Sequence, residues 1–223
     1  MIMQKKKNAV KIALADDHAL LRSALATLIE NFDECMVVNQ SGNGQELIDA
    51  MANGLVPDVV ILDLNMPKVD GLETAKWIQK NRPGINILML TMYDSELSLI
   101  RLLQAGVKGF LKKDISPSEL KSAILSVMET GFYYSNNTTG KLVSLFRNNK
   151  EGNMNLQNII LTEQEIIFLK LACSDMTYKE IAQRMGYNPR SIDTLRDHLF
   201  AKLDVKSRVG LVMVAIKNGV FTV

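Results

Sequence analysis

The sequence predicts an α/β domain with a doubly wound, parallel sheet of five strands, followed by a smaller all-α domain of four helices. Three observations lead to this prediction. Residues 8–131 alternate five times between a short apolar run and a segment with helical periodicity, the pattern of parallel strands joined by right-handed crossovers. Residues 132–158 interrupt this alternation with a stretch rich in Asn, Thr, Gly and Ser. From residue 159 onward every pattern is helical.

The third predicted strand is the clearest element of the α/β half. Four apolar residues, three of them β-branched, lead into Asp63, as in a strand that is buried on both faces. Pro67 cannot continue a ladder of hydrogen bonds, and Gly71 permits the tight turn into the next helix. The strand therefore delivers Asp63 to the carboxyl edge of the sheet. The other predicted strands are 10–15, 36–38, 85–90 and 107–111.

Helices are predicted between these strands from apolar residues at helical spacing. The strongest start is at Ser116, where a capping Ser is followed by Pro at the first helical position and by Glu119. The predicted helices are residues 20–29, 47–51, 74–80, 97–103 and 117–129.

The all-α half begins with two capping boxes, at Thr162 and at Thr177, each with Glu three residues later. A third helix opens at Asn188-Pro189, and a fourth covers about 207–217. Two short helices joined by a tight turn form a helix-turn-helix pattern. The predicted domains are residues 8–131 and 159–223, with residues 132–158 as a linker that could contain a short helix.

Composition fits a soluble globular protein of the cytoplasm. The 223 residues are 47% hydrophobic and 22% charged, and no apolar run reaches the roughly 18 residues of a membrane span, so no membrane partner is expected. The two cysteines, Cys35 and Cys173, lie in different halves, which does not suggest a disulfide framework. The net charge is +2, and the basic excess lies after residue 131. Contact with a polyanion is therefore expected in the second half.

Polar residues end four of the predicted strands at one edge of the sheet: Asp16 and Asp17, Asp63, Thr91, and Lys113. A single Asp at the end of a strand is about as often a polar residue without a function as it is part of a binding or catalytic site. The whole set of polar strand ends favours such a site. Carboxylates from Asp17 and Asp63 with the backbone carbonyl of Asn65 suit Mg²⁺. An ionised Asp63 can accept a phosphoryl group, whose charge an ammonium and a hydroxyl would neutralise.

These residues, with the run Asp63-Leu-Asn-Met-Pro67, resemble a two-component receiver domain, a flavodoxin-like fold. The resemblance implies that Asp63 is the phosphoacceptor and receives its phosphoryl group from a partner sensor histidine kinase. It implies that Asp16 and Asp17 organise Mg²⁺ beside Asp63 and Asn65.

By the same resemblance, Thr91 and Lys113 bind the phosphoryl group, and Phe110 is the switch aromatic that rotates inward as Thr91 moves. The family spacing from the aromatic selects Lys113 rather than Lys112.

Residues 161–219 resemble the helix-turn-helix of the LuxR/NarL (FixJ) family, with the matching motifs Lys179-Glu-Ile-Ala182, Arg190-Ser-Ile192 and Ser207-Arg208. The recognition helix would be about 189–203, and its N-terminal part would enter the major groove of double-stranded DNA. The residues expected at the DNA are Lys179, Arg190, Ser191, Asp193, Thr194, Arg196, Asp197, Lys202, Lys206 and Arg208.

One departure from that family is the pair Asp193 and Asp197, where related proteins often carry Lys. Asp cannot bind phosphate or the guanine acceptors, but it can accept a hydrogen bond from cytosine N4. Either the preferred DNA sequence differs from that of better-known relatives, or DNA binding is weak and another surface matters.

The sequence thus predicts a response regulator and transcription regulator that is not an enzyme and dimerises when phosphorylated. The last helix, with Leu211 to Ile216, would supply a dimer contact or simply pack within its domain. A first rival is an aspartyl phosphatase of the haloacid dehalogenase type, which would need Asp where Asn65 stands. A second is a receiver-containing adaptor that acts through protein contacts without DNA.

Overall fold

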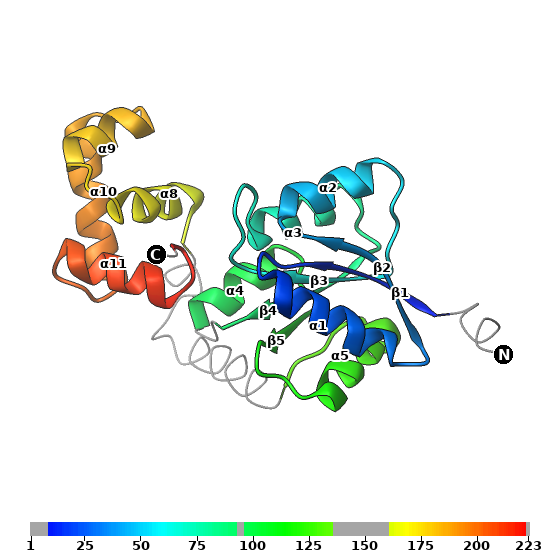
Figure 1. Cartoon of the computed structure of the whole chain (residues 1–223). Coiled ribbons are helices and arrows are strands. Elements are labelled where there is room, and N and C mark those ends of the chain that lie inside the picture. The colour runs from blue at the N-terminus through cyan, green and yellow to red at the C-terminus, as the bar shows by residue number, and fades with distance from the viewer. Residues whose placement is uncertain (1–8, 93–95, 136–160, 222–223) are drawn as a thin grey trace. The chain divides into compact units, whose positions relative to one another are not determined.

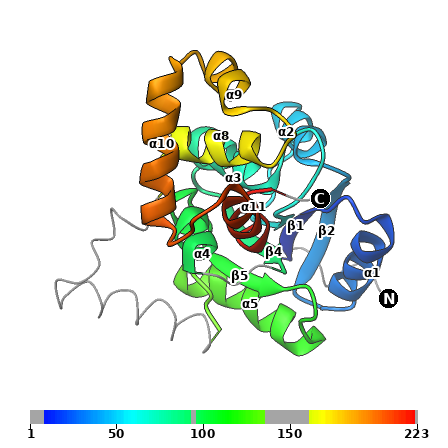
Figure 2. The same cartoon turned by 90° about the vertical axis from the view of Figure 1, so that its left-hand side faces the viewer.

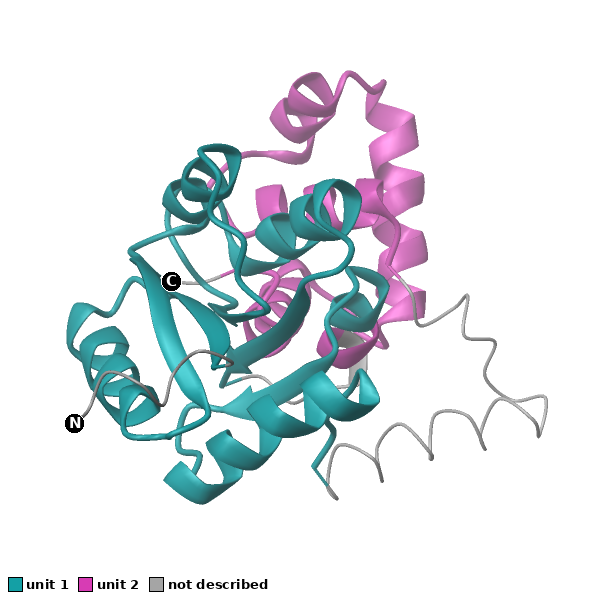
Figure 3. Ribbon diagram, turned by 90° about the vertical axis from the view of Figure 1, so that its right-hand side faces the viewer, with its two compact units in different colours: residues 1–92, 101–140 teal, residues 93–100, 141–223 magenta. Residues whose placement is uncertain are grey.

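Figure 1 shows the computed structural model of the chain, which describes residues 9–92, 96–135 and 161–221. The chain divides into two compact units, residues 1–92 with 101–140 and residues 93–100 with 141–223 (Figure 3). The division runs through helix α4 (Glu96–Gln104). The domain limits expected from the sequence therefore stay a prediction. The helix considered for the linker lies outside the described residues.

The first unit is a parallel sheet whose described strands number five, as the sequence predicts. They are β1 (Val10–Ala15), β2 (Cys35–Ser41), β3 (Val59–Asp63), β4 (Asn86–Thr91) and β5 (Gly109–Lys112), in the order β2-β1-β3-β4-β5. Every residue of β3 is buried, which explains its unbroken apolar run. The order reverses between β1 and β3, and in such sheets ligands bind outside the carboxyl ends of the strands at this reversal. The flavodoxin-like prediction is confirmed.

Helices cover both faces of this sheet (Figure 1). On one face, α1 (Ala19–Glu30) and α5 (Pro117–Thr130) share a core with the strands, in which Ile29, Ile61 and Ile124 are buried. On the other face lie α2 (Gly44–Ala52) and α3 (Gly71–Asn81). Successive strand residues point to opposite faces, so both faces of a central strand bury apolar side chains.

The turn after β3 brings the backbone close to the end of the strand. The side chain of Asp70 caps α3 by accepting from the backbone N–H of Glu73 at 2.8 Å. A Cβ on Gly71 would lie 2.1 Å from the carbonyl oxygen of Asp63, so a larger residue cannot take this position. Gly71 thus packs α3 directly against the strand end that carries Asp63.

The second unit contains α8 (Glu163–Ala172), α9 (Tyr178–Met185), α10 (Pro189–Lys202) and α11 (Arg208–Lys217). Both predicted capping boxes are present, at Thr162 and at Thr177. Gly186 ends α9 in the left-handed conformation, with φ 72°, and gives the tight turn of the helix-turn-helix. Figure 2 shows α10 as the long helix of this unit, with α9 beside its N-terminal end.

The core of this unit contains Phe168, Leu199 and Leu211, all fully buried. Leu211 and Ala215 of α11 pack within the unit, whereas Val209 and Met213 on the same helix are exposed. In the described part of the chain, none of the helices has the length and apolar character needed to cross a membrane.

Candidate functional site

Carboxylates from two strand ends meet at the carboxyl edge of the sheet. Asp16 and Asp17 follow β1 directly, and Asp63 is the last residue of β3. Together with His18 they offer ligand atoms that all lie within 4.8 Å of one another. Asp16 and Asp63 are each only 3% exposed. The structure thus brings together the acidic residues that the sequence predicted at this edge.

Lys113 follows β5 and reaches into this cluster. Its Nζ lies 2.9 Å from Asp63 Oδ2 and 3.1 Å from Asp16 Oδ2. Lys113, the lysine that the family spacing singled out, lies at the carboxylates, whereas Lys112 is exposed; the phosphoryl-binding role of Lys113 stays a prediction. One ammonium therefore faces two buried carboxylates, and the pocket keeps an excess of negative charge.

His18 belongs to this cluster but was not predicted from the sequence. Its Nδ1 lies 2.8 Å from Asp17 Oδ1 and 3.2 Å from Asp16 Oδ1, and its backbone N–H donates to Asp16 Oδ1 at 2.7 Å. The signal available in the sequence was its place directly after the two acidic residues at a strand end.

Burial dominates the electrostatics of the pocket. It raises the pKa of Asp63 to about 6, which the charges of Asp16 and Asp17 reinforce and Lys113 opposes. Burial would lower the pKa of Lys113, but its contacts with Asp63 and Asp16 raise it above the ordinary value. Asp63 is therefore less acidic than usual, and an added cation would favour its ionised form.

The donor set fits a hard divalent cation such as Mg²⁺. Within the described residues, neither Asp16 Oδ2 nor Asp63 Oδ2 accepts a hydrogen bond of ordinary geometry, although the Lys113 ammonium lies near both. These are buried oxygen atoms with acceptor capacity to spare, and carboxylate oxygens are the ligands that Mg²⁺ prefers. Asn65 follows β3 in the loop and is half-buried, so its carbonyl stays a predicted ligand.

Thr91 and Phe110 lie on β4 and β5. Thr91 is buried at the end of β4, one residue beyond Leu90, which pairs with Asp63 across the sheet. Phe110 is buried and stacks on Tyr134 with ring centroids 5.8 Å apart. Tyr133 bridges to Gly109 of β5, so the residues after α5 pack along this edge strand. The predicted roles in phosphoryl binding and switching remain predictions.

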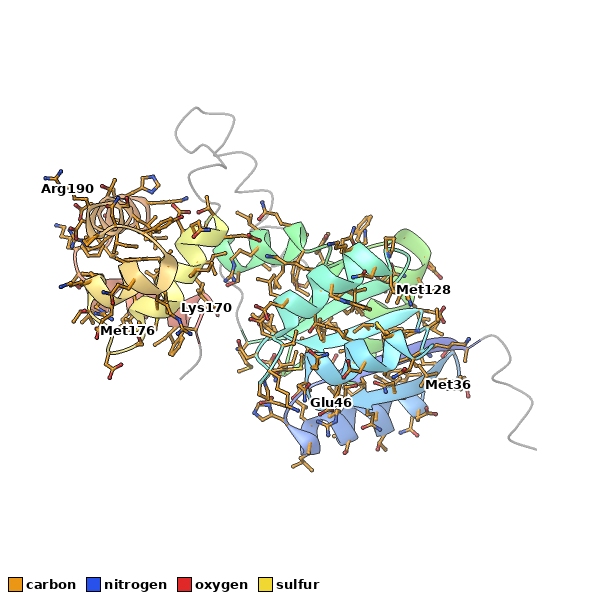
Figure 4. The ribbon with its side chains drawn as sticks, turned by 90° about the horizontal axis from the view of Figure 1, so that it is seen from above. Met36, Glu46, Met128, Lys170, Met176 and Arg190 are labelled. Atoms are coloured by element: carbon orange, nitrogen blue, oxygen red, sulfur yellow. The ribbon has the colours of Figure 1, made fainter. Side chains whose placement is uncertain are left out.

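In the second unit, seven of the ten predicted DNA-contact residues have exposed side chains. Arg190 projects away from this unit in Figure 4. The exposed residues are Lys179, Arg190, Ser191, Asp193, Thr194, Asp197 and Lys206. Arg184 in the last turn of α9 is also exposed and was not among the predicted contacts.

The other three predicted contacts are engaged within the unit. Arg196 pairs with Asp193 and Asp197, both at 2.8–2.9 Å. Arg208 donates to the carbonyl oxygen atoms of Ala172 at 3.0 Å and Ser174 at 2.6 Å.

Lys202 is the third of these engaged residues. Its Nζ lies 2.8 Å from Oε2 of the buried Glu165. Hydrogen bonds from Lys202 and from the backbone of Thr162 keep the pKa of Glu165 below its ordinary value, against the upward effect of burial. Lys202 therefore has a structural role, and its predicted role at DNA stays untested.

An acidic pocket with a lysine at the carboxyl edge of a parallel sheet, followed along the chain by a helix-turn-helix, is the arrangement expected of a two-component response regulator. Comparison with known proteins agrees. Residues 12–125 match the response regulator receiver domain, and residues 159–215 match the bacterial regulatory proteins of the luxR family. The chain belongs to the luxR-type response regulators, which pair a receiver with a DNA-binding domain.

Individual relatives align over almost the whole chain. The chain is 33% identical over 213 residues to the oxygen regulatory protein NreC of Staphylococcus carnosus (strain TM300), covering 94% of this chain and 98% of NreC. It is 28% identical over 210 residues to the response regulator GacA of Pseudomonas syringae pv. syringae (strain B728a), covering 94% and 97%. RcsB of Salmonella enterica serovar Typhimurium, bound to promoter rprA, has the same fold, with TM-score 0.66, 22% identity and coverage of 92% and 98%.

Proposed function

We propose that this response regulator acts on transcription and is switched when a sensor histidine kinase phosphorylates Asp63. The observation that carries the proposal is the position of Asp63, buried at the end of β3 with Lys113 at 2.9 Å and with Asp16 and Asp17 beside it. This arrangement holds a carboxylate, a cation and further oxygen ligands at one point. Proteins that form aspartyl phosphates need these groups together.

Phosphoryl transfer requires an ionised Asp63 and charge neutralisation around it. An oxygen of Asp63 attacks the phosphorus of a phosphohistidine, the N–P bond breaks, and an acyl phosphate forms. Lys113 neutralises part of the negative charge of the phosphoryl group, and the hydroxyl of Thr91 donates to one of its oxygens. Mg²⁺ bound to Asp16, Asp17, Asp63 and the Asn65 carbonyl would supply the rest of the positive charge.

The new charge would bias a switch that is already built into the receiver. Movement of Thr91 toward the phosphoryl group makes room on β5, and Phe110 responds. Phe110 stacks on Tyr134, so this response reaches the residues that follow α5.

The helical unit would act on double-stranded DNA in the cytoplasm, as a homodimer once Asp63 is phosphorylated. The exposed cations Lys179, Arg190 and Lys206 suit phosphate contacts from three segments around α10. The exposed Val209 and Met213 on α11 are one turn apart and give an apolar stripe for a second copy.

The direct test is incorporation of phosphate from acetyl phosphate and Mg²⁺ by the wild-type protein, by Asp63→Ala, and by Asp33→Ala as an exposed control. Incorporation is expected in the wild type and the control and not in Asp63→Ala. Incorporation that survives in Asp63→Ala would contradict the assignment. Sustained hydrolysis of a phosphomonoester would favour the phosphatase, which the Asn at position 65 argues against.

Selection from random duplexes with the phosphorylated protein tests the DNA-binding half. Enrichment of a common sequence is expected. A protein that incorporates phosphate but enriches no sequence would favour the adaptor that acts through protein contacts.

A further inference from the structure

The exposed face of the recognition helix α10 carries an acidic pair held by one arginine. Nη1 of Arg196 lies 2.8 Å from Asp193 Oδ1, and Nε and Nη2 of Arg196 both lie 2.9 Å from Asp197 Oδ1. The side chains of Asp193 and Asp197 are 53% and 65% exposed, whereas that of Arg196 is 25% exposed. The carboxylates therefore face outward, and the guanidinium lies beneath them.

The guanidinium of Arg196 is fixed by aromatic rings from two helices. Its Cζ lies 5.2 Å from the centroid of Tyr178 on α9 and 6.0 Å from that of Phe200 on α10. Stacking on these rings and pairing with two carboxylates occupy both the face and the edge of the guanidinium. Arg196 is thus placed to hold the two acids rather than to reach a DNA phosphate.

Each of the two carboxylates uses one oxygen for Arg196. No hydrogen bond among the described residues reaches Oδ2 of Asp193 or of Asp197, so these two oxygen atoms remain able to accept from a ligand. The two side chains are four positions apart, which puts them on the same face of the helix. The three side chains together carry one negative charge, so Arg196 reduces the repulsion that DNA phosphates exert on the pair.

A carboxylate can only accept hydrogen bonds, and this limits the bases that it can recognise. In the major groove, guanine and thymine present hydrogen-bond acceptors, which a carboxylate cannot bind. Adenine places its N7 acceptor beside its N6 amino group. Cytosine presents the N4 amino group without an acceptor of its own next to it. The second oxygen of an aspartate would therefore be repelled by adenine but not by cytosine.

We propose that Asp193 and Asp197 determine operator sequence by accepting hydrogen bonds from cytosine amino groups, and that Arg196 is the positioning residue that holds both carboxylates at the DNA. This inference rests on the proposed DNA-binding function and adds the base that the helix selects.

The test is selection from random duplexes with the full-length protein after treatment with acetyl phosphate and Mg²⁺. The wild type is expected to fix cytosine at one position or two neighbouring positions in each half-site. Replacing that cytosine with adenine should weaken binding about five- to tenfold, the size of one lost base contact.

Asp193→Asn supplies the sharpest variant, because the Asn amide both donates and accepts and so suits the N6 and N7 of adenine. The preference at one of these positions should change from cytosine to adenine, while Asp175→Asn, an exposed acid elsewhere in the unit, should leave the preference unchanged. A merely structural role for Asp193 would lower affinity without changing the preferred base.

Arg196→Met keeps an apolar stem over the rings and removes the charge. It should weaken binding to all duplexes and reduce the preference for cytosine. Adding Asp193→Asn and Asp197→Asn to Arg196→Met should restore affinity but not that preference.

Two results would overturn the inference. If the wild type enriches a sequence without a cytosine requirement, or if Asp193→Asn keeps the wild-type preference, the base assignment fails and DNA binding stands. If the folded, phosphorylated wild type enriches no sequence, the proposed DNA-binding function fails, and the base assignment with it.

Discussion

The two units each bury a carboxylate against a lysine, with nearly the same geometry. In the receiver, Lys113 lies 2.9 Å from Asp63; in the helical unit, Lys202 lies 2.8 Å from Glu165. Asp63 and Glu165 are each 3% exposed. Each cluster also includes an exposed histidine, and both histidines approach a buried carboxylate at 3.2 Å. Distance and burial alone do not distinguish the two sites.

They differ in how far the hydrogen-bonding capacity of the carboxylate is used. Glu165 accepts from the backbone N–H of Thr162 at 2.7 Å and from Lys202 at both oxygens, and its pKa is lowered in spite of burial. Burial raises the pKa of Asp63 to about 6, and within the described residues its Oδ2 accepts no hydrogen bond of ordinary geometry. A buried acid whose partners are complete supports the fold, whereas one with open capacity can bind and react.

The largest expected effect on stability follows from breaking the Glu165–Lys202 pair. Lys202→Met removes the ammonium partner of the buried Glu165 and leaves its charge with the backbone N–H of Thr162 and the exposed His198. It should destabilise the helical unit by about 3 kcal/mol. Hydrogen exchange of the amides in α8 and α10, measured with and without the substitution, reports this loss.

Lys206→Met is the matched control, because Lys206 is exposed on the same unit, and it should change stability by about 0.5 kcal/mol or less. Equal effects of the two substitutions would show that the Glu165–Lys202 pair does not support the helical fold.

Substitution of Asp63, the buried carboxylate with unused hydrogen-bonding capacity, is expected to raise stability rather than lower it. Because the pKa of Asp63 is about 6 in the folded state and 3.8 ordinarily, the folded protein binds more protons between these values, and its stability falls as pH rises through this window. Without divalent cations at pH 7, Asp63→Asn should therefore stabilise the receiver by about 3 kcal/mol. The single tryptophan, Trp77 on α3, provides a fluorescence signal for its unfolding by urea.

Asp63→Asn should also remove most of the loss of stability between pH 4 and 7, which the exposed-site control Asp33→Asn should retain. A wild-type receiver whose stability rises across this window would contradict the raised pKa of Asp63.

The sequence predicted the Asp63 pocket better than the Glu165–Lys202 pair. Apart from His18, the residues of the receiver pocket were predictable because they lie at or directly after strand ends, and parallel strands bring their carboxyl ends to one edge. Glu165 was predicted only as a capping residue, since its pairing with Lys202 spans 37 positions and depends on how α8 packs against α10. The same limit applies to Arg196, whose partners Asp193 and Asp197 lie within three positions of it but whose fixed orientation needs Tyr178 from another helix.

A smaller effect should follow from completing the Asp63 site with a cation. Mg²⁺ that binds the folded receiver should stabilise it by about 1.4 kcal/mol at a tenfold excess over its dissociation constant, and the gain should grow with the logarithm of concentration. Trp77 fluorescence during urea unfolding measures this gain in the wild type. It should be reduced in Asp17→Asn and should not extend to hydrogen exchange in the helical unit. Equal stabilisation of both units by Mg²⁺ would mean a general salt effect rather than a site.

The smallest effect is expected at the exposed histidine of the complete cluster. His198 Nδ1 lies 3.2 Å from Glu165 Oε1, but 63% of its side chain is exposed, and such ion pairs contribute little. His198→Gln keeps a hydrogen-bond donor and should change the stability of the helical unit by about 0.5 kcal/mol or less, measured by the same hydrogen exchange as for Lys202→Met. A loss as large as that of Lys202→Met would mean that Lys202 and Thr162 do not complete the partners of Glu165. Glu165 could then no longer be contrasted with Asp63 as a carboxylate whose hydrogen-bonding capacity is fully used.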